Sequence, residues 1–184
     1  MKRAIRTELI GVVLLALASG LWAAAAHFDL ISAQAKTYVS GYKFPATSPQ
    51  LRADKIHKQL SMDTVNNVHV TALAGPASDM FSFQIDLLTN PTIQIPNGSR
   101  LTLNVINVDD DMPHNFYLTT LAPPYPAKFT AGKTGSGTLK PYDGKIYHGA
   151  DLILKATQPG TLYYVCTIPG HAKGGMYGKI VITP

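Results

Sequence analysis

The only cysteine of this 184-residue chain lies in a short segment that also holds a histidine and a methionine. Four residues separate Cys166 from His171, and four more separate His171 from Met176. Thiolate, imidazole and thioether form a soft, nitrogen-containing donor set, which suits copper that cycles between Cu(I) and Cu(II). A trigonal copper site needs a second imidazole, which this segment lacks. The best donor elsewhere is His114, in the run 112–116 at the start of another strand-like segment.

Each of these residues, taken singly, has a structural explanation. A lone cysteine or methionine commonly fills space in a hydrophobic core, and a lone histidine is more often a surface residue than a metal ligand. The segment is, however, interrupted by Pro169-Gly170 and Gly174-Gly175, and a core strand does not carry so many turn-forming residues. The combination indicates a copper site of two histidines, one cysteine and a weak axial methionine.

Composition narrows the class of protein. The length predicts one domain, and a hydrophobic fraction of 46% is enough for a good core. Only 15% of the residues are charged, the formal net charge is +5, and lysine and arginine do not cluster. This argues against nucleic-acid binding and predicts a sparsely charged surface with a weak preference for acidic partners.

The amino terminus has the pattern of an export signal. Lys2, Arg3 and Arg6 precede the uncharged stretch 9–26, and Ala24-Ala25-Ala26 at its end offer a cleavage site. The competing interpretation of residues 1–26 is an uncleaved membrane anchor, because the apolar stretch is just long enough to span a bilayer. Either interpretation predicts that the rest of the chain lies outside the cytoplasm, in the periplasm. A free thiol is a liability there, and metal ligation would remove that liability.

The region after the export segment has weaker patterns. Residues 27–47 lack clear periodicity, which predicts a linker or loosely packed arm. Ser48-Pro49 has the form of an N-cap followed by proline at the first helical position. The spacing of Leu51, Ile56 and Leu60 then predicts a short helix with one apolar face.

From residue 65 onward the apolar residues recur with a period of two, which is typical of strands that face a core on one side. Such short strands at near-regular spacing predict an all-β sandwich or barrel. The segments that carry the pattern or an equivalent apolar run are 68–72, 81–86, 92–95, 101–105, 116–118, 146–154, 162–165 and 177–183.

Several polar residues in this region have predicted structural roles. The run 109–111 consists of three aspartates and is expected to form a solvated turn. His57, His69 and His148 are interpreted as structural. Asn115 is well placed to hydrogen-bond across to the C-terminal segment and to orient it.

The runs 163–171 and 175–181 together resemble the C-terminal loop of the rusticyanin family, blue copper proteins of the cupredoxins found in acidophilic iron-oxidising bacteria. The resemblance extends upstream to Asn90-Pro91-Thr92, His114 and Pro123-Pro124-Tyr125, and covers residues 48–184. The sulfocyanins share the loop spacing, with four residues between the cysteine and the histidine and four between the histidine and the methionine. One departure is Asn115, where rusticyanins have serine and most cupredoxins have asparagine.

The resemblance implies a Greek-key β-sandwich with an N-terminal extension. It implies one copper ion held by His114, Cys166, His171 and Met176. The implied function is periplasmic one-electron transfer from ferrous iron toward c-type cytochromes or a terminal oxidase. With four protein ligands no substrate could reach the metal, so an enzyme is not expected, and nothing in the sequence demands more than a monomer. We further expect the ring edge of His171 to reach an apolar surface patch that serves as the electron port.

Two other classes remain as alternatives. A periplasmic copper chaperone or resistance protein would need an exchangeable site and usually several methionines, whereas the four methionines after residue 26 are scattered. A binuclear copper subunit of an oxidase would need a second cysteine in the loop, where this chain has Gly170. Larger copper enzymes would need further histidine clusters and more than one domain.

Overall fold

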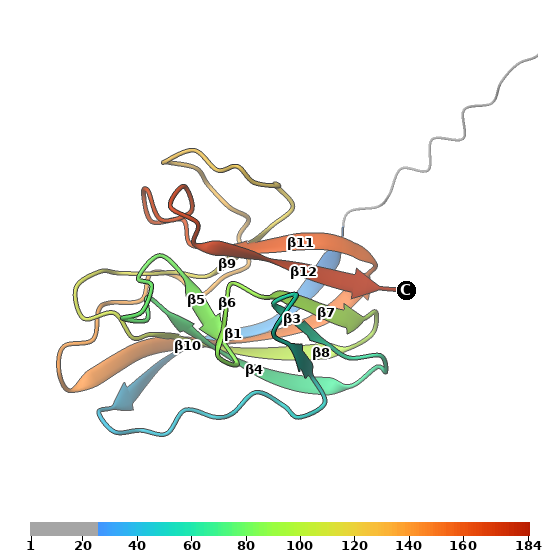
Figure 1. Ribbon diagram of the computed structural model, residues 1–184, viewed down its shortest axis with the longest axis horizontal. Helices are drawn as coiled ribbons and strands as arrows, with labels where there is room; N and C mark the ends of the chain where they lie inside the picture. The colour runs from blue at the N-terminus through green and yellow to red at the C-terminus, as the bar shows by residue number, and fades with distance from the viewer. Residues whose placement is uncertain (1–25) are drawn as a thin grey trace, which may run out of the picture.

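The protein is a β-sandwich, seen in the computed structural model that describes residues 26–184 (Figure 1). One sheet contains, in spatial order, β1 (His27–Val39), β10 (Ile146–Gln158), β8 (Arg100–Asn107), β4 (Asn67–Ala74), β5 (Phe83–Ile85) and β6 (Leu88–Thr89). The other contains β2 (Arg52–Asp54), β3 (Gln59–Ser61), β7 (Thr92–Pro96), β12 (Tyr177–Thr183), β11 (Gly160–Val165) and β9 (Tyr117–Thr119). Among these residues no helix is long and apolar enough to cross a membrane.

The strand connections pass repeatedly from one sheet to the other. β7 lies in the second sheet and the next strand, β8, in the first, while β9 returns to the second. Parallel pairing joins β4 to β8 and β7 to both β3 and β12, and the other pairs are antiparallel. This crossing topology confirms the predicted Greek-key sandwich.

The core between the sheets contains three interlocked aromatic rings. Phe116 and Tyr164 stack with their centroids 5.1 Å apart, and Phe83 meets both rings edge to face. The Tyr164 hydroxyl donates a hydrogen bond of 2.6 Å to the carbonyl of Pro91. A Cβ atom at position 178 would overlap the Tyr164 ring, so Gly178 is needed for this packing. The rings fix the end of β11, from which the chain continues directly to Cys166.

The predicted short helix after Ser48-Pro49 is wrong. This region forms β2 and β3, which pair antiparallel and are joined by a tight turn. The Asp54 carboxylate accepts hydrogen bonds from the amides of Ile56 and His57, an alternative to helical hydrogen bonding. Leu60 is buried where β3 pairs with β7, while Ile56 is 88% exposed and shares no apolar face with it.

The predicted linker over residues 27–47 is wrong for its first part. β1 pairs with β10 along nearly its whole length, from His27 opposite Gln158 to Val39 opposite Ile146. Most β1 side chains face solvent on both sides, so the strand lacks the alternation by which it could be recognised in the sequence. The predicted export segment lies outside the described residues, apart from Ala26, which is buried in the core.

Candidate metal centre

Three of the predicted ligands converge at one end of the sandwich. Cys166 and His171 lie in the loop between β11 and β12 (residues 166–176, here the ligand loop), and His114 lies between β8 and β9. The Nδ1 atoms of the two histidines are 3.1 Å apart, and the Cys166 Sγ lies 3.5 Å from Nδ1 of His171 and 4.0 Å from Nδ1 of His114. Within the described part of the chain this is the one cluster of histidine, cysteine and acidic side chains that could hold a metal.

The spacing of these three atoms fits a first-row metal ion. The point equidistant from them lies about 2.1 Å from each atom, which matches a metal–imidazole bond and is about 0.2 Å shorter than a typical metal–thiolate bond. Met176 follows in the same loop, is fully buried, and belongs to the same core cluster as Cys166. The donor set of two imidazoles, a thiolate and a thioether fits copper, as the sequence predicts.

Burial sets the protonation of the three donors in the metal-free protein. It raises the pKa of Cys166 to about 11, and hydrogen bonds from the amides of Asn115 and Ile168 oppose that rise only in part. Burial lowers the pKa of both His114 and His171, so both rings are held neutral. The site therefore presents two free nitrogen donors and a thiol that loses its proton when a metal binds.

Asp109 orients the His114 ring. Its carboxylate lies 3.0 Å from Nε2 of His114, so Nε2 donates the hydrogen bond and Nδ1 is left free to face the cluster. Burial raises the pKa of Asp109, but the hydrogen bonds from His114 and from the amides of Asp111 and Met112 outweigh it and lower the pKa overall. The expectation that residues 109–111 form a solvated turn is thus wrong for Asp109, which is 6% exposed.

Gly75 allows the polypeptide to approach this pair. It has a φ of +68°, and a Cβ atom there would overlap both the His114 ring and Asp109. Glycine is needed at this position for two reasons: it adopts the left-handed backbone conformation without strain, and it has no side chain to overlap the ring. Neither Asp109 nor Gly75 was identified in the sequence.

Two asparagines hold the two ends of the ligand loop. Asn115 accepts a 2.7 Å hydrogen bond from the amide of Thr167 and donates one to its hydroxyl, which confirms the predicted role. Asn90, between β6 and β7, donates a hydrogen bond to the carbonyl of Gly175 and accepts one from the amide of Phe83. The residues next to Cys166 and Met176 are therefore both tied to the body of the sandwich.

His171 is held by packing instead of by a carboxylate. Its ring meets Phe81 edge to face with centroids 5.1 Å apart, and the residue as a whole is 5% exposed. Phe81 is partly exposed and follows Met80, which is 47% exposed. An apolar patch thus borders His171. The remaining described histidines, His57, His69 and His148 among them, lie outside the donor cluster.

Fold and donor set define the class of protein. The chain belongs to the family of copper binding proteins described as plastocyanin/azurin, whose profile matches residues 70–183. Two crossed sheets, a loop carrying Cys, His and Met, and a second His from the body of the sandwich are the shared features of such a site.

Within this family the similarity is to rusticyanins, as the sequence predicts. The chain is 38% identical over 170 residues to rusticyanin of Acidithiobacillus ferridurans, covering 87% of this chain and 89% of that protein. Rusticyanin of Acidithiobacillus ferrooxidans matches at the same identity and coverage. A rusticyanin structure from Thiobacillus ferrooxidans superposes with a TM-score of 0.64 at 33% identity, over 73% of this chain and 86% of the other. A structure of reduced rusticyanin gives a TM-score of 0.65 at 31% identity and covers 81% of this chain and 99% of the other chain. Similarity, fold and donor set together make this protein a blue copper electron carrier.

Proposed function

We propose that this carrier works in the periplasm and transfers single electrons in a respiratory chain that begins with ferrous iron. The convergence of Cys166, His114 and His171 beside the buried Met176 carries the electron-transfer part of the proposal. The export pattern of residues 1–26 supports the location. The similarity to rusticyanins, found by sequence and by structure, supports the place in iron oxidation.

The residues of the site define how it would work. A copper ion held here would supply one-electron storage, since copper changes between Cu(II) and Cu(I). Cys166 would hold it through its thiolate, and His114 and His171 through one ring nitrogen each. Because these side chains and Met176 are at most 5% exposed, water is excluded and no position is left for a substrate. This favours a carrier over an enzyme.

The supports around the ligands keep their geometry constant. The Asp109 hydrogen bond fixes the His114 ring, and Asn115 and Asn90 fix the loop ends. A site whose donors are positioned before the metal binds changes little when the charge of the metal changes, which favours fast electron transfer. The same burial argues against the alternative of a copper chaperone, because a chaperone must expose its metal to a receiving protein.

The first test is a visible absorption spectrum of residues 26–184 with one equivalent of Cu(II), repeated after ferrous iron is added at acid pH. We expect an intense sulfur-to-copper band that iron bleaches. Cys166→Ser should lose the band and remain folded. A band that resists ferrous iron would leave the carrier intact and refute the place in iron oxidation, and the absence of a band would refute the copper centre itself.

A further inference from the structure

The loops around the ligand loop carry an unusual distribution of charge. Residues 112–142 and 152–184 contain no aspartate or glutamate, so every charged side chain in them is a lysine. Four of these lysines are exposed and lie in the ligand loop or in the connection between β9 and β10 (residues 120–145): Lys128, Lys133, Lys140 and Lys173. Lys140 lines a separate recess with Lys36 and His148, and the other three are here called the lysine collar. None of the three is among the ion pairs found in the described part of the chain.

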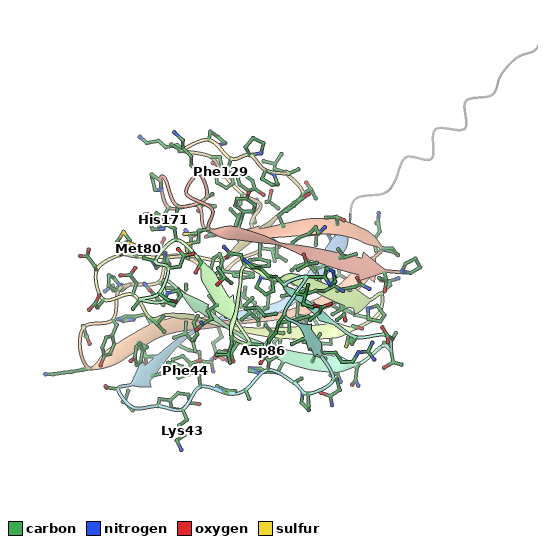
Figure 2. All side chains as sticks on the ribbon, viewed as in Figure 1. Lys43, Phe44, Met80, Asp86, Phe129 and His171 are labelled. Atoms are coloured by element: carbon green, nitrogen blue, oxygen red, sulfur yellow. The ribbon has the colours of Figure 1, made fainter. Side chains whose placement is uncertain are left out.

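The collar is packed against the metal centre. The amide of Gly170 donates a 2.8 Å hydrogen bond to the carbonyl of Ala127, next to Lys128. Phe129 stacks on Tyr125 and packs against a small buried cluster that includes Ala172, the neighbour of His171. Figure 2 shows Phe129 and His171 at the same end of the molecule. Lys128 and Lys173 therefore belong to two segments that contact each other next to His171.

Lys133 also lines a cavity of about 510 Å³ together with Phe129, Thr138 and Thr167. Asn115 also lines this cavity, and Thr167 directly follows the ligand Cys166. A cationic group at the wall of such a recess acts more strongly on an approaching anion than one on a flat surface, because the protein walls focus its field. The cavity leaves room for a carboxylate side chain of a partner beside Lys133.

Acidic side chains lie around Met80, which Figure 2 shows on the opposite side of His171 from Phe129. Met80 and Asp110 line one cavity, and Asp79 and Asp111 are also exposed in the same two loops. The apolar patch of Met80 and Phe81 thus separates the collar from a group of carboxylates. Charges of opposite sign on two sides of an apolar centre favour one orientation of a docked partner.

We propose that this end of the molecule docks a redox protein whose electron-transfer site is bordered by acidic side chains, which meet the lysine collar. The proposal rests on the proposed electron-carrier function and adds the charge of the partner and its place of contact. An anionic lipid surface fits less well, because its uniform negative charge would meet Asp79, Asp110 and Asp111 as well as the collar.

The test uses a matched pair of probes, native cytochrome c and the same protein with its lysines succinylated, which places carboxylates around the same haem edge. Stopped-flow absorption follows electron transfer with the copper-loaded protein at two ionic strengths. Surface charges act over a long range at about 10 mM and are largely screened at about 300 mM. The variants are the triple Lys128→Glu, Lys133→Glu, Lys173→Glu and the control Lys43→Glu. Lys43 is exposed and lies at the opposite edge of the molecule (Figure 2).

We expect the succinylated probe to react faster than the native one at low salt, and this preference to shrink at high salt. The triple variant should slow the succinylated probe by about tenfold or more, the range of electrostatic steering, and should speed the native probe. Lys43→Glu should change neither rate by more than about twofold. Equal rates for the two probes, or an equal effect of Lys43→Glu, would overturn the proposal.

Two controls separate this proposal from others. Reduction by uncharged hydroquinone should be the same in the wild type and the triple variant. If the wild type shows no blue band or takes no electron from hydroquinone, the carrier function fails, whereas normal reduction without a charge preference refutes the docking site alone. Binding to phosphatidylglycerol vesicles that the triple variant loses, without a preference between the two probes, would assign the collar to a membrane and overturn the proposal.

Discussion

The two histidines of the metal centre are held in different ways. His114 is fully buried, donates a hydrogen bond to the buried Asp109, and lies against Gly75. His171 has no carboxylate partner among residues 26–184, lies in the ligand loop, and packs on the partly exposed ring of Phe81. One imidazole is anchored by electrostatics inside the sandwich, and the other by packing near its surface.

This difference separates two tasks that the same side chain performs. A hydrogen bond to a carboxylate selects the tautomer of the ring and makes it a better donor, so His114 secures the metal. Contact with a partly exposed aromatic ring leaves His171 close to the surface, where another protein can approach it. The difference predicts that changes around His114 alter metal affinity, whereas changes around His171 alter access and local order.

Replacing either histidine with glycine is expected to have the largest effect, and the response to added imidazole should distinguish the two ligands. His114→Gly and His171→Gly should both lose the intense visible band when copper is added. Added imidazole should restore it in His171→Gly, because that ring lies just beneath the surface, and should restore little in His114→Gly, where the cavity is enclosed. Titration of each variant with imidazole, followed by absorption, measures this, and equal recovery would show that the two sites are equally accessible.

Asp109→Asn tests the electrostatic anchor. We expect copper affinity to fall about 10- to 100-fold, the usual cost of removing a carboxylate that supports a metal-binding histidine. Competition with a chromophoric chelator measures the affinity. Asp110→Asn is the matched control, because Asp110 is exposed in the same turn and should leave the affinity unchanged.

Acidification of the metal-free protein should reveal the burial of both rings. The pKa of each histidine is lowered below the ordinary 6.5 by burial, so the unfolded chain binds more protons between those lowered values and 6.5. Their stabilising contribution is present above pH 6.5 and is lost as pH falls through the lowered pKa values, at up to about 1.4 kcal/mol per pH unit for each ring.

Denaturant unfolding at a series of pH values measures this loss. With copper bound, both nitrogens are occupied by the metal, and the loss should begin at lower pH. If the metal-free and copper-loaded proteins lose stability over the same range, the two buried rings do not determine the acid sensitivity.

Phe81→Leu is expected to give the smallest change. It removes the edge-to-face contact with His171, which is worth about 0.5–1.5 kcal/mol in comparable aromatic pairs. The electron paramagnetic resonance signal of the copper-loaded protein should broaden, since the His171 ring is less well held. Phe129→Leu, which removes a stack on Tyr125, is the control that should cost similar stability and leave that signal sharp.

The ligands could be predicted from the sequence because their signals are local or chemically distinctive. Cys166, His171 and Met176 lie in one short segment, and His114 precedes an apolar strand. The strands from β4 onward were predictable because one face of each is buried, which produces the period of two. The helix after Ser48-Pro49 was predicted wrongly because a local cap signal was outweighed by the Asp54 turn and by pairing of β3 with β7.

The supports of the site could not be predicted, since they depend on contacts between distant segments. Asp109 is one of three consecutive aspartates, and only the folded chain shows which of them turns inward. Asn90, Gly75 and Phe81 come from loops of the first half of the chain and meet the ligands only after the sheets pack. A partial signal existed for Asn90, within the run that resembles rusticyanins.

The two asparagine contacts have a consequence for how such proteins diversify. Asn115 and Asn90 attach to Thr167 and Gly175 from outside the ligand loop, so the two ends of the segment between them are fixed from the body of the sandwich. Insertions or deletions within that segment would change the distance between His171 and its neighbours while these two end contacts stay in place. A protein designer could therefore vary the length of this segment, and mutations confined to one short stretch of the gene could change the properties of the redox centre.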